Sequence, residues 1–195
     1  MNQSSQSGQG IATDDHLLDR FAQGDRQALE ELFRRYRQAA FRVAHRLLGN
    51  EADALDAVQE GFIKALKHLD GFQGRSTFKT WLLRVVSNAA LDLGRSRGRR
   101  EGVHLDAMPG AIHNQLLSPD DTDQTLQRQE LGSLLAEALA TLTPIQRQTF
   151  VLYADAELSY REVAEATGAS LGTVMSRLFY ARQKLRAYLT QRIPL

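Results

Sequence analysis

The segment from Phe72 to Arg100 interleaves aromatic and basic residues, a combination that suits unpaired nucleic acid. Its aromatic residues are Phe72, Phe78 and Trp81, and its basic residues include Arg75, Lys79, Arg84, Arg95, Arg97, Arg99 and Arg100. An aromatic ring can stack on an unpaired base while the cations follow the phosphate backbone. Core packing at helical spacing is the alternative for Phe78 and Trp81. The arginine cluster favours a site for a single strand.

The end of the chain carries a second basic region with the pattern of a helix-turn-helix. Five Arg or Lys residues and no acid lie between Ser170 and Leu195. Ala164 provides the small residue of a close helix crossing, Gly168 the turn, and Val174 the buried residue of the second helix. A small helical bundle with a solvated basic end is the alternative. Two separated basic surfaces indicate a polyanion that is held at two places.

The second helix of this unit is expected to have an inward and an outward face. The inward residues are Leu171, Val174, Leu178, Ala181 and Leu185. Its N-terminal half would approach base edges in the major groove, and its later cations would contact mainly phosphates. The residues expected at the duplex are Ser170, Gly172, Thr173, Ser176, Arg177, Tyr180, Arg182 and Lys184.

The composition favours a packed helical protein without catalytic chemistry. The 195 residues are 43% hydrophobic, include 4 Pro and no Cys, and carry a net charge of +1. The absence of Cys excludes disulfides and thiolate metal sites. No carboxylate pair, metal cluster or nucleophile–base arrangement stands out, so we expect no enzymatic activity, metal, cofactor or small-molecule substrate. No apolar run is long enough to insert in a membrane.

Helical periodicity and helix-start signals predict an all-α fold of two small helical domains. Helices are expected at 14–22, 26–48, 51–69, 78–93 and 125–142, followed by three short ones. Those three start at capping boxes on Thr143 and Ser159 and at the N-cap Ser170. The expected organisation is a disordered tail (1–12), a first domain (13–100), a linker (101–124) and a second domain (125–195).

The helix at 51–69 is expected to bury one stripe and expose another. Its large apolar residues recur at spacings of three or four, which predicts a buried face made of Leu55, Val58, Phe62, Leu66 and Leu69. Another face carries the acidic and amide residues Asp53, Asp56, Gln59 and Glu60. Without further information, that face is a solvated surface held by pairs such as Glu60 with Lys64.

Four segments in order resemble a bacterial sigma factor of the extracytoplasmic-function (ECF) type, within the sigma-70 family. GDRQALEELFRRY (24–36) resembles the opening of the second conserved region, and DALDAVQEGFIKAL (53–66) resembles its polymerase-binding helix. FQGRSTFKTWLLRVVSNAALD (72–92) resembles the promoter-melting segment, and the helix-turn-helix resembles the fourth region. The resemblance covers about residues 15–189 and implies that the first domain is region 2 and the second is region 4.

The resemblance implies a partner for the acidic face. Asp53, Asp56, Gln59 and Glu60 would dock on the clamp coiled coil of the beta prime subunit of core RNA polymerase, and region 4 would contact the beta flap. An acidic and amide-bearing helix face can pair with arginines of a partner helix. Leu55 departs from the polar or acidic residue usual in the family. Gly61 departs from Thr or Ala, at a cost in helix propensity of up to about 1 kcal/mol.

The resemblance also divides the promoter between the two domains. Region 4 would read the minus-thirty-five element as duplex. The loop from Phe72 to Thr77 would receive a base flipped from the minus-ten element, and Asn88 and Asp92 would read or frame that strand. The minus-ten residues are then Phe72, Gln73, Gly74, Arg75, Ser76, Thr77, Lys79, Trp81, Arg84, Asn88, Arg95, Arg97, Arg99 and Arg100.

The resemblance further implies a bacterial cytoplasmic protein that takes part in a stress response. Such factors are usually held inactive by an anti-sigma factor, often a membrane-anchored one. The first alternative function is a stand-alone helix-turn-helix regulator of transcription whose N-terminal half senses a ligand or dimerises. A helical nucleic-acid enzyme is the second alternative.

Overall fold

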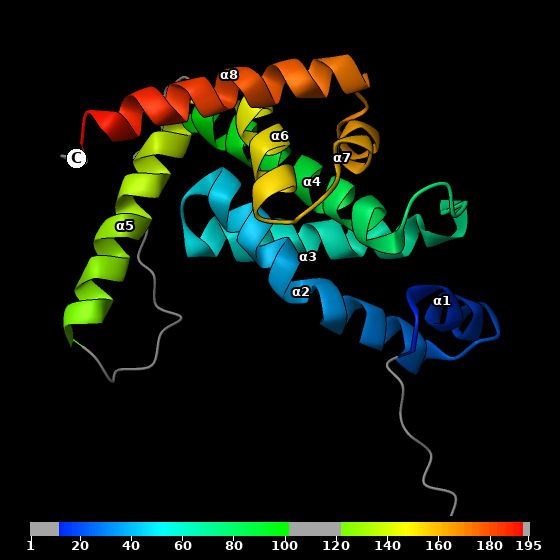
Figure 1. Ribbon diagram of the computed structural model, residues 1–195. Coiled ribbons are helices and arrows are strands. Elements are labelled where there is room, and N and C mark those ends of the chain that lie inside the picture. The colour runs from blue at the N-terminus through cyan, green and yellow to red at the C-terminus, as the bar shows by residue number, and fades with distance from the viewer. Residues whose placement is uncertain (1–11, 102–121, 193–195) are drawn as a thin grey trace, which may run out of the picture. The chain divides into compact units, whose positions relative to one another are not determined.

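Figure 1 shows a computed structural model of the chain, which describes residues 12–101 and 122–192. Within these ranges the structure contains α-helices, one short 3-10 helix and no strand, which confirms the all-α class. The helices are α1 (Asp14–Ala22), α2 (Arg26–Leu48), α3 (Glu51–Lys67), η1 (Leu69–Gly71), α4 (Phe78–Glu101), α5 (Thr122–Ala140), α6 (Pro144–Ala154), α7 (Tyr160–Thr167) and α8 (Leu171–Thr190). None of the described helices is both long enough and apolar enough to span a bilayer.

The chain forms two compact units, Met1–Gln38 and Ala39–Leu195, and each is described by itself. In the first unit, α1 begins at the N-cap Thr13 and buries Leu17. Asp14 accepts hydrogen bonds from Arg35, at 2.6 Å, and from the Tyr36 hydroxyl. Burial, together with this carboxylate, raises the pKa of Tyr36. These contacts tie α1 to the N-terminal half of α2.

In the second unit, α3 and α4 pack against each other (Figure 1). Small residues of α3 form most of the contact. The buried face of α3 consists of Ala54, Ala57, Val58, Gly61 and Ala65. A Cβ on Gly61 would lie 2.8 Å from Val86 Cγ2 and 2.9 Å from Val86 Cα. The structure therefore explains why position 61 is a glycine: no side chain larger than hydrogen fits between α3 and α4 at this point.

Because the small residues face inward, the predicted buried stripe of α3 is partly wrong. Val58 and Leu69 are buried as expected, but Leu55 and Leu66 are 52% and 48% exposed. The tight approach of α4 selects the face with the least side-chain volume. Leu55, Ile63 and Leu66 are thereby turned outward, and Phe62, also predicted to be buried, is half-buried.

The predicted fourth helix is longer than expected. It continues from the expected end at Leu93 to Glu101, and α5 already begins at Thr122. The part of the predicted linker between these helices, residues 102–121, lies outside the described residues, as does the predicted tail up to residue 11. The division into two domains stays a prediction.

The last four helices are α5 to α8, and the three predicted start signals, those of α6, α7 and α8, are confirmed. The prediction that all three of these helices are short is wrong for α8, which has 20 residues. Thr143 with Gln146 and Ser159 with Glu162 form capping boxes, and Ser170 caps α8. A core cluster joins the end of α5 to α8, made of Ala138, Leu139, Leu142, Ala181 and Leu185.

The buried side chain of Arg147, in α6, forms hydrogen bonds with the C-terminal ends of two other helices. Its guanidinium donates to the carbonyl oxygens of Leu139, Ala140, Leu142 and Leu47. Such carbonyls at helix C-termini have no partner within their own helix. Arg147 therefore satisfies acceptors at the ends of both α5 and α2.

Candidate nucleic-acid and protein interfaces

The outward face of α3 carries apolar and acidic residues side by side. Leu55, Ile63 and Leu66 are between 44% and 52% exposed. Asp56, Gln59 and Glu60, three of the four predicted docking residues, are exposed on the same helix. A helix face with large uncovered aliphatic side chains beside carboxylates can bury area against a partner and pair with its cations.

Asp53, the fourth predicted docking residue, is held within the fold. Its Oδ2 accepts from Asn50 Nδ2 at 2.7 Å and from Arg97 Nη1 at 2.5 Å. Its backbone N–H donates to Asn50 Oδ1 at 2.8 Å, which caps α3. The structure therefore joins a residue predicted to bind polymerase to one predicted to bind DNA.

The aromatic residues before and within α4 form one cluster. The ring centroid of Phe72 lies 5.3 Å from that of Trp81 and 6.0 Å from that of Phe78. Phe78 is only 2% exposed, so core packing is the correct interpretation for this ring and it does not face an unpaired base. Phe72 and Trp81 are half-buried and keep part of their rings at the surface.

The loop between η1 and α4 presents polar side chains beside that cluster. Gln73, Gly74 and Arg75 are exposed, and Gly74 has a φ of +65°, which glycine adopts without strain. Thr77, also predicted to bind DNA, accepts from the backbone N–H of Thr80 at 3.1 Å and so begins α4. Ser76 is half-buried between them.

The cations of α4 are divided between exposed positions and ion pairs. Arg84 and Arg99 are exposed, and Lys79 is half-buried. Arg95 forms an ion pair with Asp92 one turn earlier, which explains how a carboxylate is tolerated in this basic segment. The side chain of Arg100 lies outside the described part of the structure.

Asn88 lies on the exposed side of α4 but already has a partner. Its Oδ1 accepts a hydrogen bond from Gln148 Nε2 of α6 at 3.1 Å, and the same amide donates to Ser87 Oγ at 3.0 Å. Glu162 of α7 accepts from the buried hydroxyl of Thr80 at 3.1 Å. In this arrangement a base would compete with Gln148 for Asn88 Oδ1, whereas the Nδ2 group could donate to a base without breaking that bond.

The geometry of α7 and α8 confirms the predicted turn. Gly168 ends α7 in the left-handed region, with φ of +64°, and Ser170 accepts from the backbone N–H of Thr173 at 3.1 Å. Val174 is fully buried, as expected. Gly172 and Ser176 are exposed near the N-terminus of α8, and Thr173 and Arg177 are half-buried beside them.

The outward face of α8 is more apolar than the sequence interpretation assumed. Leu171 was expected to point inward, but it is 43% exposed because Val174 and Leu178 occupy the contact with the other helices. Met175, Phe179 and Tyr180 are each more than half exposed. Met175 and Phe179 were missed, although the helical periodicity that places Val174 inward also places them outward.

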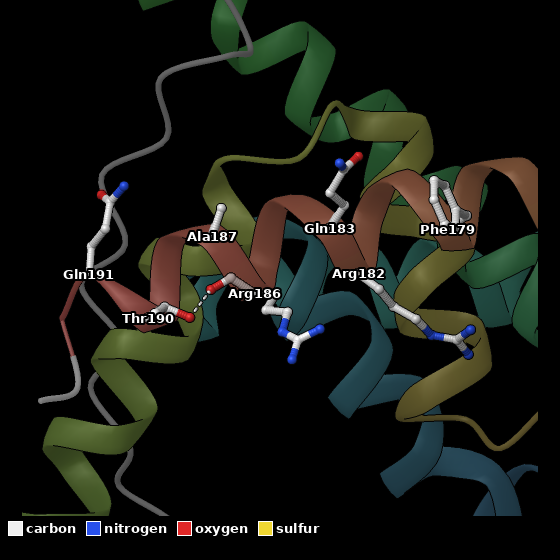
Figure 2. Close-up of a pocket in the computed structure, with 7 residues that line it drawn as sticks. All are labelled: Phe179, Arg182, Gln183, Arg186, Ala187, Thr190 and Gln191. Carbon is white, nitrogen blue, oxygen red and sulfur yellow. Dashed lines mark hydrogen bonds between the residues drawn. The ribbon is translucent and has the colours of Figure 1, made fainter. Parts of the chain in front are cut away.

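Figure 2 shows an open groove that continues this face toward the C-terminus of α8. It is lined by Phe179, Arg182, Gln183, Arg186, Ala187, Thr190 and Gln191. Arg182 lies 5.1 Å above the ring of Tyr153 and donates to the hydroxyl of Tyr160 at 3.4 Å. Lys184 donates to Gln146 Oε1 at 3.4 Å. Both predicted phosphate ligands are thus oriented by neighbouring helices.

Among the described residues, no group of three or more His, Asp or Glu side chains is placed to hold a metal ion. The described residues present three surfaces suited to binding: a mixed apolar and acidic face on α3, an aromatic and basic surface along α4, and an outward α8 face.

Comparisons with known proteins match both parts of the chain. The family models for Sigma-70 region 2 and for Sigma-70, region 4 match residues 32–100 and 133–185. The ECF RNA polymerase sigma factor SigE of Mycolicibacterium smegmatis is 36% identical over 87% of this chain, which spans 66% of that protein. The ECF RNA polymerase sigma-E factor of Haemophilus influenzae is 32% identical over 89% of this chain and 93% of its own length.

Two solved structures resemble the fold. CnrH in complex with the cytosolic domain of CnrY superposes with a TM-score of 0.69, at 27% identity over 92% of this chain and 99% of that one. RpoE from Bartonella quintana, in complex with the anti-sigma factor NepR, has a TM-score of 0.64 at 28% identity. The second match covers 85% of this chain and 98% of the other.

Proposed function

The chain belongs to the extracytoplasmic-function sigma factors of the sigma-70 family, and we propose that it directs core RNA polymerase to particular promoters, promotes their melting and starts transcription. The matches to regions 2 and 4 support this function over a stand-alone helix-turn-helix regulator, because they account for the N-terminal part of the chain as well. The protein acts in the bacterial cytoplasm, where the polymerase is.

The observation that carries the proposal is the outward face of α3. Leu55, Ile63 and Leu66 are uncovered in the described structure, and Asp56 and Glu60 are exposed on the same helix. A partner that buries this face must offer apolar area together with cations. The beta prime clamp coiled coil is the proposed partner, and the beta flap is the proposed partner of region 4.

Region 2 captures the opened strand in this proposal. The exposed loop residues Gln73 and Arg75 and the accessible edges of Phe72 and Trp81 lie together at the start of α4. Unstacking one base costs a few kcal/mol, which stacking and hydrogen bonds in the loop offset. The cations along α4 then hold the phosphates of the same strand.

Region 4 contacts the minus-thirty-five duplex through α8. In this proposal Ser176 and Arg177, near the helix N-terminus, contact base edges and phosphates. The exposed Met175 and Phe179 add an apolar surface, which suits the C5-methyl groups of thymines in the major groove. The two regions together hold one promoter at two places, which raises effective concentration without new contacts.

Control by an anti-sigma factor is part of the proposal. Two proteins of the same fold, CnrH and RpoE, have been solved in complexes with CnrY and with the anti-sigma factor NepR. An inhibitor that covers the exposed faces of α3 and α8 would block polymerase and promoter together, and a membrane-anchored inhibitor is the form we expect. Isolation of the chain from its own cells should recover core polymerase or such an inhibitor. Recovery of neither counts against this control.

Run-off transcription with purified core polymerase tests the function. We expect initiation at specific promoters from genomic fragments, and Arg177→Ala should weaken promoter recognition with little change in affinity for core. An equal loss of both in Arg177→Ala would indicate misfolding. High-affinity duplex binding by the chain alone, without any initiation, would favour the stand-alone regulator.

A further inference from the structure

The end of α4, residues 94–101, is helical although its composition disfavours a helix. Gly94 and Gly98 fall in this part, and the helix continues to Glu101. Glycine is the poorest helix former after proline because it loses the most backbone freedom. A helix end of this composition needs contacts from other parts of the fold to stay ordered.

The ion pair between Arg97 and Asp53 supplies such a contact. Arg97 Nη1 donates to Asp53 Oδ2 over 2.5 Å and joins residues 44 positions apart in the sequence. The same oxygen accepts from Asn50 Nδ2 at 2.7 Å. The carboxylate also lies in the first turn of α3, where the helix N-terminus stabilises a negative charge. The Asp53 carboxylate is therefore held in place by contacts that do not depend on Arg97.

Asp53 differs in this respect from the other residues of the predicted polymerase face. Its side chain is 21% exposed, whereas that of Glu60 is 49% exposed. A carboxylate whose oxygen already serves two donors would have to give up contacts within the fold in order to bind an arginine of a partner. Asp56 and Gln59 are exposed.

We propose that Asp53 is a positioning residue for promoter DNA and not a contact for polymerase. It anchors Arg97 and so orders the arginine-bearing end of α4, where Arg95 and Arg99 project along the path of the phosphates. The ligand that the ordered end of α4 would bind is the sugar-phosphate backbone of the opened strand. The proposal rests on the proposed function of α4 and gives Asp53 a role within it.

Amide hydrogen exchange on the whole chain tests the anchoring step without polymerase or DNA. Asp53→Asn and Arg97→Gln should each accelerate exchange across residues 94–101 by about fivefold, because a partly exposed ion pair is lost from a weak helix end. The matched control Asp56→Asn should leave that segment unchanged. Unchanged exchange at 94–101 in Asp53→Asn overturns the proposal, whatever the promoter assays show.

Holoenzyme assays test the functional step. With a forked promoter fragment whose minus-ten strand is unpaired, Asp53→Asn should lose about fivefold in DNA affinity and less than twofold in affinity for core polymerase. Asp56→Asn should show the reverse pattern. Adding Asp53→Asn to Arg97→Gln should cause no further loss, because both changes break one pair.

Two results would contradict the positioning role: a loss of core affinity in Asp53→Asn as large as in Asp56→Asn, or independent, additive losses of DNA affinity. A wild-type holoenzyme that fails to bind the forked fragment would refute the proposed function instead. The exchange experiment would then still decide whether Asp53 anchors the end of α4.

Discussion

Gly61→Ala has two opposite effects on the free energy of unfolding: a gain in helix propensity and a steric cost against α4. The structure indicates which of them is larger. In an open helix, Ala in place of Gly stabilises by about 1 kcal/mol. At Gly61 the new Cβ would lie 2.8 Å from Val86 Cγ2 and 2.9 Å from Val86 Cα. The second contact is with backbone, so a rotamer change of Val86 cannot relieve it. Because the backbone must shift, the cost lies in the upper part of the usual range, at about 2–3 kcal/mol.

We therefore expect Gly61→Ala to lower the free energy of unfolding by about 1–2 kcal/mol. Urea unfolding followed by circular dichroism measures the change, with an unchanged m-value as the check on two-state behaviour. Gly132→Ala is the matched control, because a Cβ at this α5 position has nothing within 4 Å. It should be neutral or stabilising. If Gly61→Ala stabilises the chain as Gly132→Ala does, the close packing of α3 on α4 is wrong.

Leu66→Ala should weaken binding to core polymerase about tenfold without loss of stability. The reason is that an exposed Leu side chain contributes hydrophobic free energy only when a partner covers it. Leu131 on α5 is also exposed, and Leu131→Ala should leave core binding unchanged. Replacing thymine by deoxyuracil in the minus-thirty-five element should weaken binding of the wild type, and Met175→Ala should reduce that sensitivity; equal sensitivity in both proteins would exclude a methyl contact. Burial lowers the pKa of His45, so the unfolded state binds the proton more readily and stability should fall as pH drops below about 6.5. Melting temperatures between pH 5 and 8 should show a smaller fall for His45→Gln, and an identical fall would remove His45 as the cause.

The helix-turn-helix could be predicted from the sequence almost completely because its signals are local. Capping residues, a glycine in the left-handed region and a buried Val174 each depend on a few neighbouring positions. The starts of α6 and α7 were equally predictable, because Thr143 and Ser159 form the capping boxes that the neighbouring residues indicate. Local hydrogen bonds of this kind do not require knowledge of the rest of the fold.

The orientation of α3 could not be predicted in the same way. Periodicity identifies the largest apolar residues, and it placed Leu55 and Leu66 inside. The structure buries Ala54 and Gly61 instead, because closely packed helices exclude side-chain volume from their contact. The face of α3 that becomes buried depends on how closely α4 approaches. The separation of the two helices is determined by the residues of both.

The length of α4 and the role of Asp53 are also tertiary effects. Two glycines near the end of α4 argue for an earlier stop, and the pairing of Arg97 with Asp53, 44 positions away, is a tertiary contact of the additional turns that sequence spacing does not reveal. Sequence spacing correctly grouped the acidic residues of α3 on one helix. It could not show that Asp53 turns toward α4 while Asp56 is exposed.

We propose that this chain works only as part of a larger transcribing enzyme, which binds the exposed face of α3. The most direct measurement is run-off transcription with purified core polymerase and this chain, with the Leu66→Ala variant assayed beside it. We expect promoter-specific transcripts from the wild type and fewer from Leu66→Ala at limiting protein. Failure of the pure chain to bind core polymerase at micromolar concentration would contradict it, even if α8 binds a duplex tightly.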